Sequence, residues 1–165
     1  MRADQLIGQA AVLEGLCSHP AVKAILAWKP EALVDAKFDR NELTLTIAAE
    51  EIRTAATTVQ SAGYNFFEDV TAVDWFPSSP RFQLSYHIVS HQYMERIRLR
   101  VMVEGDAPVV ESITAVWPSA NFYEREVFDL FGITFEGHPN LCRIMMPDDW
   151  QGYPLRKDYP VEGYR

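Results

Sequence analysis

The sequence predicts an α+β fold: a two-layer domain with a mainly antiparallel mixed sheet and helices on one of its faces. The first observation is the order of periodic segments, which is helix, two strands, helix and three strands (α-β-β-α-β-β-β). The second is the alternation of apolar and polar residues between 43 and 47, directly after the turn formed by Asp39, Arg40 and Asn41. A further helix and an irregular C-terminal tail follow this domain.

Each element has a local signal. An apolar stripe predicts the first helix, which Ser18-His19-Pro20 ends, and Gly63 is the expected cap of a later helix. Strands are expected over residues 32–38, 42–48, 66–76, 82–90 and 96–103. Helices are expected over residues 4–16, 21–28, 49–61, 111–117 and 119–131. After Gly132 the regular pattern stops.

Composition limits the classes of function. The chain has 165 residues, of which 48% are hydrophobic and 23% are charged, and these values suit one globular domain. The net charge of -8 argues against non-specific binding of nucleic acid or anionic lipid. There is no membrane-spanning apolar run and no signal-peptide pattern, so we expect the protein in the cytoplasm or on the cytoplasmic face of a membrane. Cys17 and Cys142 lack CxxC spacing and are expected to be small buried residues.

Three arginines and two histidines lie on or beside the later strands. Arg96, Arg98 and Arg100 alternate with apolar residues, so their guanidinium groups share one face of a strand. Two interpretations of this row stay open, a solvated sheet face and a surface that docks to an acidic partner. His87 and His91 are four positions apart on a strand, roughly 13 Å, which is too far to share a metal ion. We expect both histidines to be solvated.

The helix expected over 119–131 is rich in charge. Arg125 and Asp129 are four positions apart and can form an ion pair along the helix. Glu124 and Glu126 point in divergent directions, which disfavours a catalytic acid–base pair. We expect these two carboxylates to anchor the irregular tail or a neighbouring protein.

A second charged group surrounds Gly152-Tyr153-Pro154. Asp148 and Asp149 lack the third ligand that a metal site needs, so a fixed loop with paired charges and packed aromatic rings is favoured over a metal site. The chain contains no GxGxxG, GxxxxGK[ST], HExxH or GxSxG pattern. We therefore expect no catalytic residue, metal or nucleotide in this chain.

The segment that begins at Tyr123 is dense in aromatic and charged residues, Pro and Gly, and it is too aromatic for a plain surface loop. It contains the runs Glu124-Arg125-Glu126-x-x-Asp129-Leu130-Phe131-Gly132-Ile133, Gly137-His138-Pro139-x-Leu141-x-Arg143-Ile144-Met145-Met146-Pro147-x-Asp149-Trp150 and Gly152-x-Pro154-Leu155-Arg156-Lys157-Asp158-Tyr159-Pro160. Over residues 121–163 it closely resembles the C-type subunit of proton-translocating NADH:quinone oxidoreductase, respiratory complex I.

The resemblance implies a non-catalytic subunit of the peripheral arm, on the cytoplasmic face of the cell membrane. It implies no cofactor in this chain, whereas the complex carries electrons from NADH through FMN and iron-sulfur clusters to quinone. The implied partners are the quinone-site (D-type) subunit and the neighbouring iron-sulfur subunits, and contact with the membrane is made only through the complex. The residues expected to dock on partners are Glu124, Arg125, Glu126, Asp129, His138, Arg143, Asp149, Trp150, Arg156, Lys157, Asp158 and Tyr159.

We divide the chain into an α+β domain over residues 1–118 and a helix with a docking tail over residues 119–165. The tail is expected to need partners for its order. An alternative within the same superfamily is the homologous subunit of a membrane-bound energy-converting hydrogenase or of another quinone-linked dehydrogenase. A free-standing binding module would leave the tail aromatics exposed, and a lone enzyme would need a catalytic site that the sequence does not offer.

Overall fold

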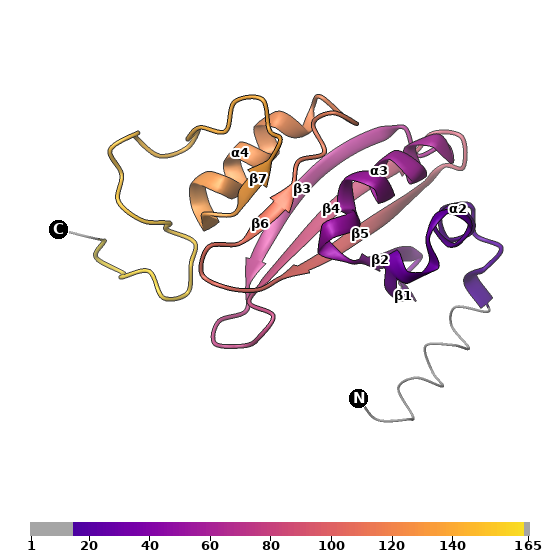
Figure 1. Cartoon of the computed structure of the whole chain (residues 1–165), viewed down its shortest axis with the longest axis horizontal. Helices are drawn as coiled ribbons and strands as arrows, with labels where there is room; N and C mark the ends of the chain where they lie inside the picture. Colours follow the sequence, from indigo (N-terminus) through magenta and orange to yellow (C-terminus); the bar gives the residue numbers. More distant parts are fainter. Residues whose placement is uncertain (1–14, 164–165) are drawn as a thin grey trace.

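The computed structural model describes residues 15–163. Its larger sheet has five strands in the order β1-β2-β5-β4-β3. The strands are Leu33–Asp39 (β1), Glu42–Ile47 (β2), Phe66–Asp74 (β3), Phe82–Ser90 (β4) and Glu95–Val103 (β5). Neighbouring strands are antiparallel except β2 and β5, which run parallel. The expected α+β class, a mainly antiparallel mixed sheet with helices on one face, is confirmed (Figure 1).

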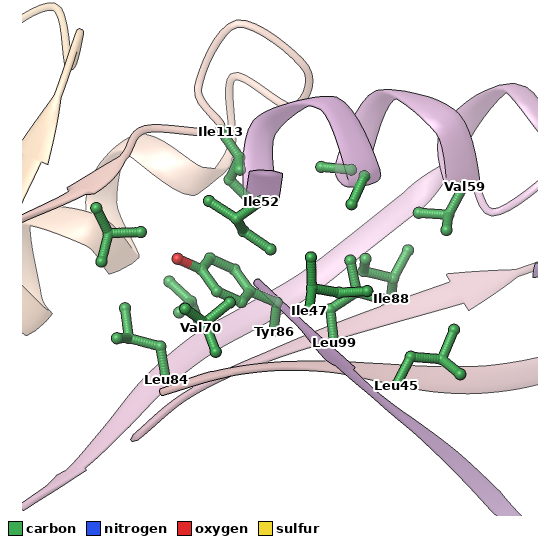
Figure 2. Packing of buried hydrophobic residues seen from close by; sticks show 14 of the residues in the cluster. Leu45, Ile47, Ile52, Val59, Val70, Leu84, Tyr86, Ile88, Leu99 and Ile113 are labelled. Atoms are coloured by element: carbon green, nitrogen blue, oxygen red, sulfur yellow. The ribbon is translucent and has the colours of Figure 1, made fainter. Parts of the chain in front are cut away.

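The helices bury apolar side chains against one face of this sheet. They are Pro20–Trp28 (α2), Ile52–Ser61 (α3) and Ala120–Phe131 (α4), with short 3-10 turns at Pro30–Ala32 (η1) and Ala49–Glu51 (η2). The helix expected over residues 4–16 lies outside the described residues except for its last two positions. Figure 2 shows Ile52 and Val59 of α3 facing Ile47 and Leu99 of the sheet.

The core forms because alternate residues of each strand point to the helical face. The register aligns Leu45, Leu99, Tyr86 and Val70 across four strands, and all four are at most 4% exposed. The same buried cluster continues into α4 and beyond it, through Val127, Phe131, Ile133 and Phe135. The sheet and residues 127–135 therefore share one core.

The opposite face of the sheet carries the arginine row, and its charges are neutralised within the chain. Arg96 Nε donates to Glu42 at 2.8 Å, and Arg98 also contacts Glu42. Arg98 Nε donates to His87 Nε2 at 2.8 Å, so the other ring nitrogen of His87 donates to Asp69 at 2.6 Å. The expectation of a solvated His87 is wrong, because the strand register places this residue between Asp69 and Arg98. The row is a cross-strand network rather than a freely solvated surface.

Four local expectations need correction. The helix expected over 111–117 is absent; Val109–Glu111 (β6) instead pairs in parallel with Thr134–Glu136 (β7), a strand in the tail that showed no period in the sequence. The third strand, which was expected to reach residue 76, ends at Asp74. It ends there because the Asp74 carboxylate accepts the Phe76 N–H at 2.9 Å and turns the chain. Cys17 is exposed rather than buried, since it lies in the turn before α2.

Candidate partner-docking surface

Three consecutive N–H groups of the tail converge on one carboxylate of α4. Asp129 Oδ2 accepts hydrogen bonds, at 2.9, 2.7 and 2.8 Å, from the backbone N–H groups of Ile144, Met145 and Met146. Asp129 Oδ1 accepts from Arg143 Nη1 at 2.6 Å. The Asp129 side chain is completely buried. A single carboxylate on a packed helix therefore fixes the path of residues 143–146.

The Asp129–Arg143 pair is also tied to the following loop. The Arg143 guanidinium donates to the carbonyl groups of Trp150 at 3.1 Å and Gly152 at 3.2 Å, and it lies 5.5 Å from the centre of the Tyr153 ring. Burial by itself would raise the pKa of Asp129. The backbone N–H bonds and the Arg143 guanidinium outweigh burial, so the pKa of Asp129 falls below its ordinary value. This carboxylate is therefore ionised and fully hydrogen-bonded at neutral pH.

Arg125 contacts the tail through carbonyl groups. Its Nε donates to the carbonyl of Cys142 and its Nη2 to the carbonyl of Arg143, both at 3.1 Å. The ion pair expected between Arg125 and Asp129 is therefore not formed, because Asp129 is buried against Arg143 while Arg125 reaches over the backbone of the tail. Both side chains of the expected pair hold the same stretch of tail by different means.

A second buried carboxylate, Glu124, connects α4 to the loop after β6. Its two oxygens accept from the Ser112 hydroxyl at 2.6 Å and from the Ile113 N–H at 2.8 Å. Burial, which is complete, raises the pKa of Glu124 from 4.5 to about 7, although both hydrogen bonds oppose that rise. Nearby, the buried Tyr86 hydroxyl and Trp117 Nε1 have no hydrogen-bond partner among residues 15–163.

His138 joins the start of the tail to α4. Its Nδ1 accepts the Asn140 N–H at 3.0 Å, so the Nε2 carries the proton and faces the Asn121 carbonyl at 3.3 Å. Burial lowers the pKa of His138, with the nearby Arg125 charge acting in the same direction. A neutral His138 with this tautomer satisfies both contacts.

We call Asp129 and Glu124, each with its partners, the first two anchors. A third anchor, which the sequence did not predict, surrounds Arg81. Its guanidinium binds Asp74 of β3 at 2.9 Å, Asp106 at 2.8 Å and Asp158 of the tail at 2.6 Å. The Asp74 carboxylate also accepts the Lys157 N–H at 2.9 Å. Hydrogen bonding to Arg81 is the main cause that lowers the pKa of Asp158. No local pattern identifies this cluster, because Arg81 and Asp158 are separated by 77 positions and meet only in the fold.

Arg156 holds the tail at the end of α4. Its Nε donates to the Phe131 carbonyl at 2.6 Å, and its Nη1 donates to the Asp106 carbonyl at 2.9 Å. The guanidinium lies between two rings, 4.8 Å from the centre of Tyr153 and 5.2 Å from the centre of Phe82. Arg156 thus satisfies the Phe131 carbonyl, which the end of α4 would otherwise leave without a partner.

These anchors point inward, and they leave large apolar side chains exposed on the stretch that they fix. We call residues 143–155 the docking segment. Its exposed apolar side chains are Ile144 (39%), Met145 (62%), Trp150 (39%) and Leu155 (50%). Exposed apolar side chains on a loop that is held in place are hydrated unfavourably, and they are typical of surfaces that bind another protein.

The other predicted docking residues lie around this segment. The side chains of Glu126, Asp149 and Lys157 are exposed. Tyr159 is partly buried, and its hydroxyl donates to the Gln151 carbonyl at 3.3 Å. The structure therefore divides the predicted residues into inward anchors and outward side chains, a division that the sequence did not reveal.

Within residues 15–163, no three side chains of His, Cys, Asp or Glu are grouped so that they could hold a metal ion. None of the helices in this part of the chain combines the length and the apolar character that a membrane span needs.

Residues 45–165, most of the chain, match the protein family described as respiratory-chain NADH dehydrogenase, 30 Kd subunit. The chain belongs to this family. Similar members include the C subunit of the NADH-quinone oxidoreductase of Citrifermentans bemidjiense, 46% identical over 134 residues that cover 80% of this chain and 83% of that protein. The corresponding protein of Roseiflexus castenholzii is 43% identical over 147 residues, 87% of this chain and 84% of that protein.

Two solved structures extend the family resemblance to the fold. A trypsin-resistant fragment (1-134) of Nqo5 aligns with a TM-score of 0.64 and 30% identity, over 73% of this chain and 99% of the fragment. One polypeptide of the membrane-bound sulfane sulfur reductase, an archaeal respiratory membrane complex, aligns with a TM-score of 0.75 and 28% identity, over 85% of this chain and 84% of that polypeptide. In this family member, the matched stretch includes α4, all three anchors and the docking segment.

Proposed function

We propose that this protein is the C-type subunit of a proton-translocating NADH:quinone oxidoreductase, in which electrons pass from NADH through FMN and iron-sulfur clusters to quinone. Its relatives named as the C subunit of NADH-quinone oxidoreductase, at 46% and 43% identity, support this role. The protein itself carries no cofactor and catalyses no step. It braces the quinone-site (D-type) subunit and the neighbouring iron-sulfur subunits at the cytoplasmic face of the membrane.

The observation that carries the docking role is the fixed presentation of Met145. Its backbone N–H is held by the buried Asp129, while its side chain is 62% exposed. A loop that is already ordered loses little conformational entropy when it binds, so its apolar side chains can contribute their burial to affinity. Docking of this kind requires no chemistry from the chain.

The test compares two charge-introducing variants in the organism's own complex. Met145→Asp places a charge in the proposed interface and should reduce the amount of assembled complex on a native gel at least about tenfold, a loss of at least about 1.4 kcal/mol. Met94→Asp is the matched control, because Met94 is even more exposed, at 85%, but lies in the turn between β4 and β5. Normal assembly of the Met145→Asp complex would contradict the docking role.

A second candidate is the equivalent subunit of another membrane-bound redox complex, such as an energy-converting hydrogenase or another quinone-linked dehydrogenase. The alignment with a polypeptide of the sulfane sulfur reductase, at a TM-score of 0.75, supports this second candidate. The two candidates differ in the electron donor. A complex purified through a tag on this chain should reduce quinone with NADH under the first proposal, and absence of that activity together with a different donor would favour the second.

A further inference from the structure

A hollow of about 230 Å³ lies between α4 and β3. Figure 1 shows these two elements packed beside each other. The floor of the hollow consists of apolar side chains from both elements, each at most 9% exposed: Val70, Ala72, Val127 and Phe131. The hollow is therefore closed at its base by the hydrophobic core.

The mouth of the hollow adjoins the docking segment. The exposed residues that line it include Tyr123 and Glu126 of α4 and Leu155, the last residue of the docking segment. The Leu155 N–H donates to the Leu130 carbonyl of α4 at 3.1 Å, which fixes the end of the docking segment at this mouth. The hollow is thus continuous with the proposed docking surface.

Size and lining indicate what the hollow can receive. It is smaller than the roughly 300–1,000 Å³ of a typical small-molecule site, and its apolar floor suits one large apolar side chain. Side chains that fill such pockets contribute much of the affinity of protein interfaces. A second feature is the Glu126 carboxylate, which is exposed at the mouth and forms no ion pair or hydrogen bond with any described residue. A Lys or Arg next to the inserted side chain would match this charge.

We propose that one large apolar side chain of a neighbouring subunit inserts into the hollow between α4 and β3, and that an adjacent Lys or Arg of that subunit pairs with Glu126. The inference rests on the proposed function, because that function supplies the neighbouring subunit. It adds a socket on this chain, which receives a side chain, to the docking segment, which presents its own.

Hydroxyl-radical footprinting of the full-length chain and of the purified complex tests whether the mouth is covered. Oxidation of Tyr123, which is 37% exposed in the chain alone, should fall about tenfold in the complex. Tyr93 is the matched control, because it is 39% exposed but lies in the turn between β4 and β5, and its oxidation should not change. Protection of Met145 without protection of Tyr123 would overturn only this inference. Oxidation of both residues in the complex would contradict the docking role itself.

Ala72→Leu tests occupation of the hollow, because the larger side chain fills the floor from within. The chain alone should unfold at an equal or higher temperature, since the substitution fills a cavity. When the variant and the parent chain are co-expressed, the purified complex should contain about tenfold less of the variant. Incorporation equal to that of the parent would overturn insertion into the hollow.

The Glu126 carboxylate tests the basic partner and does not depend on packing of the floor. In the same competition with the parent chain, Glu126→Lys should be incorporated about tenfold less, and Glu126→Gln should be affected less. Glu31→Lys is the control, because Glu31 is an exposed residue of η1, which precedes the strand at the opposite end of the sheet from β3. Equal incorporation of Glu126→Lys and Glu31→Lys would contradict a Lys or Arg at this place.

Discussion

The Asp129 carboxylate and the Arg143 guanidinium meet at 2.6 Å inside this chain, and the same carboxylate binds three consecutive N–H groups of the tail. The tail therefore obtains from its own helix the polar partners that its irregular backbone requires. Its exposed apolar side chains are then carried on a backbone that contacts within the chain hold in place. This relationship makes stability and docking separable in experiments.

Removal of the Asp129 carboxylate should be strongly destabilising. Asp129→Ala leaves the partly buried Arg143 guanidinium and three N–H groups without their acceptor, and breaking a pair with one fully buried partner costs up to about 3–5 kcal/mol. Urea unfolding of the full-length chain measures the change in the free energy of unfolding. Glu126→Ala, on the exposed side of the same helix, should change it by less than about 0.5 kcal/mol. Equal effects of the two variants would refute the anchoring role of Asp129.

Gly132 should tolerate no side chain. It has a φ of 70°, and a Cβ there would lie 2.4 Å from the ring of Tyr153. Gly105 also has a positive φ, of 84°, but its Cβ would meet nothing within 4 Å. Gly105→Ala should therefore cost about 1–2 kcal/mol from backbone strain alone. Gly132→Ala should cost about 1–3 kcal/mol more because of overpacking.

The comparison of the two glycine variants also reports on the tail. Displacement of Tyr153 should expose the chain near residue 153 to limited proteolysis in Gly132→Ala but not in Gly105→Ala. The same cleavage pattern in both variants would mean that Tyr153 does not hold the tail against α4.

The buried Glu124 makes stability depend on pH near neutrality. Its pKa rises from 4.5 in the unfolded chain to about 7 in the folded one, so the folded state holds the proton more tightly. The stabilisation that the protonated Glu124 gives the folded state is fully present below pH 4.5. It is lost as the pH rises to about 7, and the free energy of unfolding falls by about 3 kcal/mol. Acidic groups with lowered pKa values, such as Asp129, act in the opposite direction at lower pH.

Glu124→Gln isolates this effect, because the neutral amide cannot ionise and can still bond to Ser112. The difference in unfolding free energy between the parent chain and this variant should change by about 3 kcal/mol between pH 4.5 and pH 8. The variant should gain relative stability as the pH rises. A difference that stays constant over this range would show that Glu124 has the same pKa in both states.

Arg156 should affect assembly rather than turnover. Arg156→Ala leaves the Phe131 and Asp106 carbonyl groups without their donor and removes the side chain packed between Tyr153 and Phe82, at a cost of about 1–3 kcal/mol. Native gels should contain less assembled complex, while NADH:quinone activity per flavin stays near normal. Lys23→Ala is the control, because Lys23 is an exposed residue of α2 and lies outside the tail and its anchors. A large fall in activity per flavin with normal assembly would instead point to a direct role at the quinone site.

The fold was largely predictable because its signals are local. The alternation at Leu43, Leu45 and Ile47 and the turn at Asp39–Asn41 predicted β1 and β2 close to their observed bounds. The short strands β6 and β7 were missed because three residues carry too little periodicity, and each is stabilised by pairing with a segment far along the chain.

The site was predictable only in part, for a related physical reason. Charged residues of the tail were expected to dock on partner subunits, and their contacts within the chain could not be predicted. Asp129, for example, pairs with Arg143 rather than with the nearer Arg125. The Arg81 cluster depends on residues from β3, a loop and the tail, and no spacing in the sequence brings them together. Long-range pairing of this kind is a property of the folded chain.

The exposure of Met145 in the chain alone and in the complex is the most direct test of docking. Hydroxyl-radical footprinting should oxidise Met145 and Met94 readily in the full-length chain, where they are 62% and 85% exposed. In the purified complex, oxidation of Met145 should fall about tenfold while that of Met94 is unchanged, since burial in an interface excludes solvent. Unchanged oxidation of Met145 in an intact complex that contains this chain would contradict docking through residues 143–155.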